Sequence, residues 1–384
     1  MAIHYKHKAL DMTILIEEVV TLRQLKQFVK FPYRLYKKNP FWVPPIYLDE
    51  LNTLRRDKNP AFDHCEAKYW LAYQDGHMVG RVAAILNKLH MEKWNQPYVR
   101  FGWIDFIDDE EVSKALIATV ENWAKQKGMK AVHGPLGFTD LDNEGMLIEG
   151  FDEVGTLATL YNFHYYPEHL AKLGYTKDID WVEYEIDVPS EPNEKIERIA
   201  DIALRRNNLT LLKLKNKKEL RGYAEDVFDV LDETYAQLYG VVPLSEKQVQ
   251  AYINQYFGFV NPEFVPLVVD ANGKLVAFGI TMPSLSRALQ KSQGKLLPFG
   301  FIHLLKALKK NDRADLYLVG VRREYQGKGV NAALINEMNK VYNKYGIPKV
   351  ESNPELENNV LVQEQWKYFD KRQHKRRRVF IKQL

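Results

Sequence analysis

Residues 323–342, with the sequence REYQGKGVNAALINEMNKVY, join a glycine-rich loop directly to an uninterrupted helical pattern. The apolar run at 314–321 before the loop is typical of a strand, so we expect a strand, a loop and a helix in that order. Gly327 and Gly329 let the backbone turn sharply and leave its N–H groups uncovered. Because the first turn of a helix also has free amides, the sequence predicts an anion site here, most often one for a pyrophosphate.

Two other phosphate-binding motifs compete for this stretch. A P-loop needs a glycine five residues before its Gly-Lys pair and Ser or Thr after it, but Arg322 and Gly329 stand there. The dinucleotide fingerprint G-x-G-x-x-G/A does match, at Gly327, Gly329 and Ala332, and Glu351 follows about 20 residues later. That fingerprint begins directly after its strand, whereas RREYQ separates strand and glycine here. It stays the weaker alternative, and a plain surface turn would not explain the flanking basic residues.

The chain repeats one order of elements. Hairpin patterns occur at 68–87 and 264–284, with the turn pairs Asp75-Gly76 and Asn272-Gly273. After each hairpin come a strand, a helix, another strand, a short helix and a terminal strand. This order predicts an α+β fold in which each half is a mixed, mostly antiparallel sheet flanked by helices. Two unrelated α+β halves with ordinary hairpins are the alternative.

The joint between the copies is expected at 187–208, where a Pro, Ser and Glu cluster leads into a helix. We therefore expect an N-terminal lobe at 1–190 and a C-terminal lobe at 191–384, each long enough for its own core.

Composition limits the partners. The chain has 54 Lys and Arg against 50 Asp and Glu, and this net charge of +4 predicts no nucleic-acid partner. Its single cysteine, Cys65, excludes an internal disulfide. Neither a secretory signal nor a long apolar run is found, so we expect a cytoplasmic protein.

The stretch VRREYQGKGV at 321–330 resembles the acyl-CoA signature Arg/Gln-x-x-Gly-x-Gly/Ala of the GCN5-related N-acetyltransferase (GNAT) superfamily. Gln326 takes the Arg/Gln position, and Asn331 departs from the final Gly or Ala. Both copies also resemble the GNAT order of elements, which implies two tandem GNAT-like lobes. The KNPAF and GRVAA stretches of the first copy resemble a bacterial group of tandem GNAT proteins that includes the bacterial ceramide synthases.

This resemblance implies that the loop amides hold the pyrophosphate of acetyl-CoA or a longer acyl-CoA, while the preceding strand pairs with the pantetheine arm. The implied cofactor contacts are Leu318, Val319, Val321, Arg322, Gln326, Gly327, Lys328, Gly329, Val330 and Asn331. In the first copy, IDDEEVSKAL at 107–116 has four consecutive carboxylates and no glycine. Carboxylates repel a pyrophosphate, so we expect acyl-CoA in the second lobe alone. The same residues also suit a helix N-terminus.

GNAT enzymes usually protonate the leaving thiolate from a tyrosine in the helix after the fifth strand. Aligning that pattern on Asn359 puts Trp366 at the tyrosine position, so Tyr368 becomes the candidate acid. Glu351, at the end of a strand, is the candidate base or acceptor ligand. The candidates for the acceptor site lie in irregular stretches of the first lobe and are Asn143, Glu144, Tyr161, Asn162 and His164. Structural roles remain the alternative for each of these residues, and no metal site is predicted.

One insertion, at 286–310, is apolar with lysines clustered at its ends. Such a segment lies on a membrane surface, lines an acyl channel, or packs against the other lobe. We predict an acyl-CoA-dependent N-acyltransferase that modifies a primary amine, one with a long, sphingoid-like chain, at the inner face of the membrane. The alternatives are a small-amine or amino-acid N-acetyltransferase and a non-catalytic acyl-CoA sensor.

Overall fold

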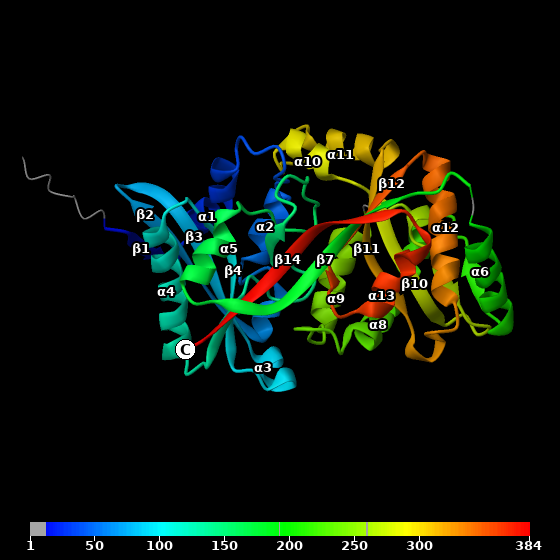
Figure 1. Ribbon diagram of the computed structural model, residues 1–384, viewed down its shortest axis with the longest axis horizontal. Helices are drawn as coiled ribbons and strands as arrows, with labels where there is room; N and C mark the ends of the chain where they lie inside the picture. Colours follow the sequence, from blue (N-terminus) through cyan, green and yellow to red (C-terminus); the bar gives the residue numbers. More distant parts are fainter. Residues whose placement is uncertain (1–12, 192, 259) are drawn as a thin grey trace, which may run out of the picture.

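The computed structural model describes residues 13–191, 193–258 and 260–384. Figure 1 shows an elongated molecule in which two halves lie end to end, joined by two long strands, β7 and β14, that cross the middle. The halves follow the two copies that the repeat predicts.

The first half begins with β1 (Leu15–Glu18), α1 (Leu22–Leu35), α2 (Tyr47–Thr53), β2 (Cys65–Gln74), β3 (His77–Asn87), α3 (Lys88–Trp94) and β4 (Tyr98–Phe106). It continues with α4 (Glu110–Gln126), β5 (Ala131–Gly134), β6 (Met146–Glu149), α5 (Tyr165–Lys172) and β7 (Thr176–Asp187).

The second half begins with α6 (Glu194–Arg206), β8 (Thr210–Leu212), α7 (Lys217–Gly222), α8 (Ala224–Tyr235), α9 (Glu246–Tyr256), β9 (Leu267–Val269) and β10 (Leu275–Pro283). Its remaining elements are α10 (Ser286–Ser292), α11 (Gly300–Lys309), β11 (Arg313–Val321), α12 (Val330–Tyr345), β12 (Lys349–Ser352), β13 (Glu355–Leu356), α13 (Val360–Gln363) and β14 (Lys371–Gln383).

All of these strands belong to one 14-stranded sheet. The main path runs β1-β2-β3-β4-β5-β14-β7-β12-β11-β10-β9-β8, while β6 pairs with β14 and β13 with β7. Among the described strands, only β4–β5 and β11–β12 pair in parallel. The predicted α+β class, with mostly antiparallel sheets flanked by helices, is confirmed.

The two halves exchange their terminal strands. β14, the last strand of the second half, pairs with β5 of the first, and β7 of the first half pairs with β12 of the second. β7 and β14 also pair with each other over most of their length. A boundary near residue 190 therefore divides the chain but does not divide the sheet, and the lobe limits stay a prediction.

Both predicted hairpins form. Asp75 and Gly76 have φ of 51° and 75°, the left-handed values that a two-residue hairpin turn requires. The second turn is wider, because the N–H of Asp270 donates to the carbonyl of Lys274 at 3.0 Å and Asn272-Gly273 lie inside that loop.

Helices α4 and α12 each cover one half of the sheet, and their starts differ. The Asp109 carboxylate accepts the N–H of Glu111 at 2.9 Å, so it caps α4, whereas Gly329, with φ of 82°, caps α12 without a side chain. In the first half, a carboxylate of the acidic stretch thus accepts a hydrogen bond from the helix N-terminus that a phosphate would otherwise accept. No helix among the described residues is long and apolar enough to cross a membrane.

Candidate active site

The predicted anion loop lies between β11 and α12. After one 3-10 turn at Arg323–Tyr325, Gly327 and Gly329 adopt φ of 72° and 82°. Among the described residues, four amides of this stretch donate no hydrogen bond, those of Gly327, Gly329, Val330 and Asn331. The tip of the loop, Gln326 to Lys328, is exposed. Free amides on an exposed turn at a helix N-terminus form a surface that attracts phosphate.

One predicted cofactor contact has another role. Arg322 is buried, and its guanidinium donates to the Leu275 carbonyl at 2.7 Å and to the Glu233 carboxylate at 2.6 Å. It therefore supports the loop from beneath, and its predicted contact with the cofactor stays a prediction. Lys328 is exposed, with its Nζ 5.3 Å from the ring centre of Tyr325, and is available to an anion.

The strand before the loop has an open edge. β12 pairs with β11 only as far as Leu316 and Ser352, after which the N–H of Asn353 donates to the Leu316 carbonyl at 3.1 Å. Further along, the hydroxyl of Tyr235 donates to the Val319 carbonyl at 3.1 Å and accepts the Val319 N–H at 3.4 Å. An extended ligand can pair with this edge as a strand would, once Tyr235 gives up these bonds.

A bulge on β11 presents two residues that we did not predict. The register shift between Ile280 and Thr281 leaves Tyr317 as the extra residue, and its hydroxyl donates to Asp315 Oδ2 at 3.4 Å. Burial and, next, the negative charge of Glu351 raise the pKa of Asp315 to about 7. Asp315 is therefore partly protonated at neutral pH and suited to proton transfer. The sequence signal that could have identified Asp315 is an acidic residue within an otherwise apolar strand.

Glu351 was predicted as the base or as an acceptor ligand, and its surroundings do not support the role of a base. Its side chain is buried and accepts a hydrogen bond from Lys375, and the His374 Nε2 lies 3.4 Å from its Oε1. Burial favours protonation of Glu351, but these two partners outweigh it and hold its pKa at about 2. A carboxylate that binds protons so weakly is a poor base and a good structural ion-pair partner.

The donor atoms of Glu183, Glu351 and His374 lie within 4.8 Å of one another, close enough to suggest a metal site. Two buried cations already occupy this cluster, however. Lys375 Nζ lies 3.8 Å from Glu183 Oε2 as well as bonding Glu351, and Arg377 donates to Glu183. The two carboxylates are thus balanced, and a metal ion would add uncompensated charge. The absence of a metal stays a prediction.

Tyr368 lies on the surface, where it is 36% exposed. Its ring lies 4.8 Å from the Nζ of Lys195 and 5.2 Å from that of Lys367. Trp366, at the aligned tyrosine position, is buried and donates its indole N–H to Glu355 Oε1 at 2.7 Å. This placement does not support the predicted role of Tyr368 as the acid.

Three of the predicted acceptor residues contact neighbouring parts of the first half. The Asn162 amide bonds the backbone of Leu147 in both directions, at 2.7 and 3.0 Å, and so holds β6. The Tyr161 hydroxyl donates to the Phe151 carbonyl at 2.9 Å, and His164 is exposed beside the Phe151 ring. The acceptor role of these three residues, and of Asn143 and Glu144, stays a prediction.

Glu144 belongs to a set of three carboxylates at alternate positions after β5. Burial raises the pKa of Asp140 and of Asp142 to about 6, and it raises that of Glu144 well above its ordinary value. Asp142 accepts the N–H groups of Phe138 and Thr139, whereas Glu144 has no hydrogen bond or ion pair among the described residues. All three residues are partly exposed, although Asp140 Oδ1 is buried without a hydrogen-bond partner among the described residues.

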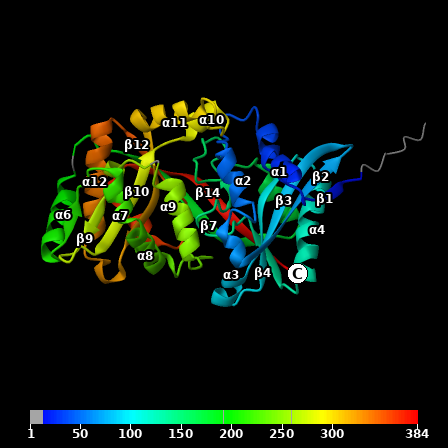
Figure 2. The ribbon, with the colours of Figure 1, turned by 180° about the vertical axis from the view of Figure 1, so that it is seen from behind.

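These carboxylates face the second half. Thr139 Oγ1 lies 2.9 Å from the hydroxyl of Tyr252 on α9, and Tyr256 on the same helix interacts electrostatically with Asp142 and Tyr317. Figure 2 shows α9 beside α2 of the first half. The acidic loop and the Asp315–Tyr317 pair therefore line the same contact between the halves.

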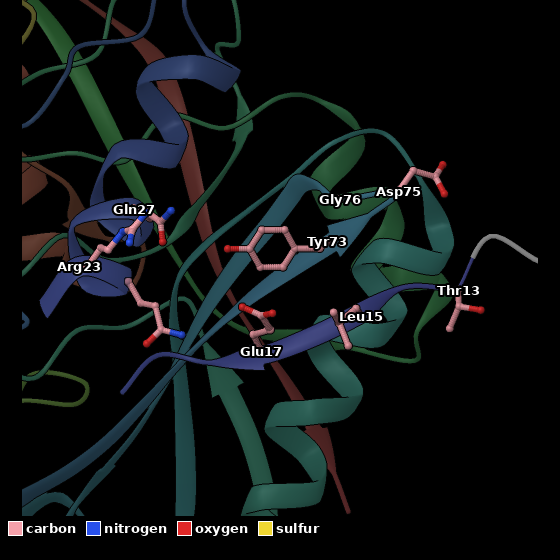
Figure 3. A pocket seen from close by; sticks show the side chains of 9 residues that line it. Thr13, Leu15, Glu17, Arg23, Gln27, Tyr73, Asp75 and Gly76 are labelled. Atoms are coloured by element: carbon pink, nitrogen blue, oxygen red, sulfur yellow. The ribbon is translucent and has the colours of Figure 1, made fainter. Parts of the chain in front are cut away.

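A separate hollow lies at the outer end of the first half (Figure 3). It is lined by β1, α1 and the first hairpin turn, with Glu17, Arg23 and Tyr73 in its wall. Figure 1 places β1 at the opposite end of the molecule from α12, so this hollow is separate from the glycine loop.

No protein-family model matches the chain. Among curated proteins, the chain is 28% identical over 379 residues to Protein YghO of Escherichia coli (strain K12), covering 96% of this chain and 95% of that protein. It is 26% identical over 316 residues to the bacterial ceramide synthase of Caulobacter vibrioides, covering 80% of each chain.

Solved structures agree with the predicted fold. A tandem GNAT protein from the clavulanic acid biosynthesis pathway covers 97% of this chain and 98% of its own, with a TM-score of 0.53 and 13% identity. A GCN5-related N-acetyltransferase from Sphaerobacter thermophilus covers 96% and 95%, with a TM-score of 0.52 and 12% identity. The chain therefore has the tandem GNAT fold, and the fold that the sequence resemblance implied is confirmed.

Proposed function

We propose that this chain, which has the tandem GNAT fold, is an acyl-CoA-dependent N-acyltransferase that modifies a primary amine. The observation that carries the proposal is that a loop with free backbone amides directly follows a strand whose edge is open. The unpaired amides of Gly327, Gly329, Val330 and Asn331 suit a pyrophosphate, and the edge at Val319 suits the amides of a pantetheine arm. The first half has an acidic helix cap where the loop would be, so the proposal assigns one acyl-CoA to each chain.

Acyl transfer needs a neutral amine, because an ammonium has no lone pair with which to attack a thioester. In this proposal the ammonium gives a proton to the Tyr317 hydroxyl, whose own proton passes to Asp315 Oδ2. The nitrogen then attacks the thioester carbonyl, a C–N bond forms and the C–S bond breaks. The proton that the nitrogen loses as the amide forms balances the one that the departing thiolate takes up.

Glu355 is our candidate for the thiolate's proton donor, in place of the missing tyrosine. It lies on β13, just beyond the point where β12 leaves β11, and interacts electrostatically with Tyr235 at the open edge. Its Oε2 is buried without a hydrogen-bond partner among the described residues, while Trp366 holds its Oε1. Burial raises the pKa of Glu355 to about 7, so a proton is available at neutral pH.

We further propose that the acceptor is a long-chain amine. The relative from Caulobacter vibrioides, named a bacterial ceramide synthase, supports this choice. The unpaired carboxylate of Glu144, with Asp140 and Asp142 nearby, suits the ammonium group of such a substrate. A position at the inner face of the membrane belongs to the same proposal.

The release of CoA in the presence of amines tests this function. Thiol release from palmitoyl-CoA should depend on an added sphingoid base and should exceed the rate with a short alkylamine or an amino acid. Faster turnover of acetyl-CoA with small amines would favour the small-amine alternative. If acyl-CoA raised the melting temperature but no amine released thiol, the chain would be a sensor. The replacement of the expected tyrosine by Trp366 favours this alternative.

A further inference from the structure

The insertion at 286–310 forms α10 and α11 with a short loop between them. One face of α11 packs inward, where Leu304 is buried and Leu308 contacts the same cluster as Met282 and Tyr317. Figures 1 and 2 show both helices along one long side of the molecule, above the junction of the halves. The insertion is thus firmly attached to the fold close to the candidate active site.

The opposite face of this insertion is apolar and uncovered. Leu297 and Phe299, in the loop, are 73% and 70% exposed, and Leu305 on α11 is 53% exposed. Phe301 and Ile302 are exposed beside them. Because Phe301 and Leu305 are four residues apart, they lie on one side of the helix and extend the apolar loop. Such a cluster of large exposed side chains marks a binding surface.

Positive charge surrounds this apolar cluster. Residues 286–311 contain one arginine and five lysines and no acidic residue, in a chain that otherwise has nearly equal numbers of both charges. Lys295, Lys306 and Lys309 are exposed, and Lys309 continues the row of Phe301 and Leu305 along α11. We call this set the α11 surface, and it comprises Lys295, Leu297, Phe299, Phe301, Ile302, Leu305, Lys306 and Lys309.

We propose that the α11 surface docks on an anionic lipid bilayer. Exposed aromatic and aliphatic side chains enter the boundary between head groups and acyl chains, while a row of lysines pairs with lipid phosphates. A segment with no acidic residue matches a uniformly negative surface rather than a protein face of mixed charge. Docking brings the bilayer close to Tyr317 and, if the proposed function holds, would let a long-chain amine enter from the membrane.

Co-sedimentation of the full-length chain with vesicles tests the docking without any substrate, so its outcome is independent of the proposed function. We expect binding to vesicles that mix phosphatidylcholine with phosphatidylglycerol, and little binding to phosphatidylcholine alone. The double variant Leu297→Ser, Phe299→Ser should bind at least about tenfold more weakly. The matched control Val360→Ser, Leu361→Ser changes two apolar residues on α13 that are also largely exposed, 58% and 73%, and should bind normally.

The lysines have their own test. Lys306→Gln with Lys309→Gln should weaken vesicle binding about thirtyfold, since each lysine near an anionic surface contributes about fivefold. Lys114→Gln with Lys125→Gln, two exposed lysines of α4, should leave binding unchanged. Equal binding by all variants, or no binding to anionic vesicles, would overturn the proposal. So would a dimer in sedimentation that the Leu297 and Phe299 changes abolish, because a second copy would then cover the surface.

Discussion

Replacing Asp315 by asparagine should lower kcat by about a hundredfold or more while acyl-CoA still binds, since proton transfer by a positioned group contributes rates of this order. The asparagine side chain would keep the shape of the aspartate but could not accept the proton from Tyr317. The wild-type kcat/KM should rise with pH up to about 7, where Asp315 becomes ionised, and this limb should vanish in Asp315→Asn.

Further variants distinguish a loss of catalysis from a loss of folding. Tyr317→Phe should cause a similar loss, and the double variant should be little worse than either single one, because the two groups act as one relay. Asp312→Asn, at an exposed ion pair with Arg287 next to the same strand, is the matched control and should retain full activity. A full rate in Asp315→Asn, or an unchanged pH profile, would exclude the relay.

Replacing Lys375 by methionine should lower the free energy of unfolding by about 3–5 kcal/mol, the usual cost of removing one partner from a buried ion pair. Lys375 on β14 is buried beside Glu351 on β12 and Glu183 on β7. The variant would leave the two buried carboxylates with Arg377, which donates to Glu183, and with His374, whose Nε2 lies 3.4 Å from Glu351 Oε1. The loss of unfolding free energy therefore measures how strongly this cluster holds the exchanged strands together.

Chemical denaturation with a control lysine provides the comparison. Lys382→Met, on the same strand, removes a more exposed pair with Glu121 at 2.9 Å and should cost about 1 kcal/mol or less. Adding Glu351→Gln to Lys375→Met should recover part of the loss. The low pKa of Glu351 stabilises the wild type above the unfolded value of 4.5, and this contribution is lost as pH falls towards 2. The cost of Lys375→Met should accordingly shrink in acid, and an equal cost for both lysines at neutral pH would contradict the ion-pair account.

The parts of this fold that could be predicted are those with local signals. Asp75-Gly76 marks a hairpin through its own backbone preference and lies where expected, and Gly346 ends α12 through the same left-handed preference. The glycine loop was also recognisable, because free amides follow from the positions of Gly327 and Gly329 alone. These features need no knowledge of the rest of the chain.

The exchange of β7 and β14 could not be predicted, because strand patterns do not say which sheet a strand joins. The same gap limits what the sequence alone says about the surroundings of the site residues. Glu351 looked like a free carboxylate until β14 brought Lys375 against it, and Arg322 looked like a phosphate ligand until α8 brought Glu233. Asp315 was not predicted as a site residue, because its raised pKa depends on burial and on Glu351 of the neighbouring strand.

We propose that the loop at Gly327 binds the pyrophosphate of one acyl-CoA per chain, and the remaining roles depend on this binding. Calorimetric titration of CoA tests it with two variants, Gly327→Ala and Gly273→Ala. Both glycines have left-handed φ, 72° and 81°, and an added Cβ would meet nothing within 4 Å in either, so both changes should strain the backbone equally.

We expect one CoA site per chain, about tenfold weaker in Gly327→Ala and unchanged in Gly273→Ala. NADH should not bind. Two equal CoA sites, an equal loss in both variants, or binding of NADH instead of CoA would contradict the account.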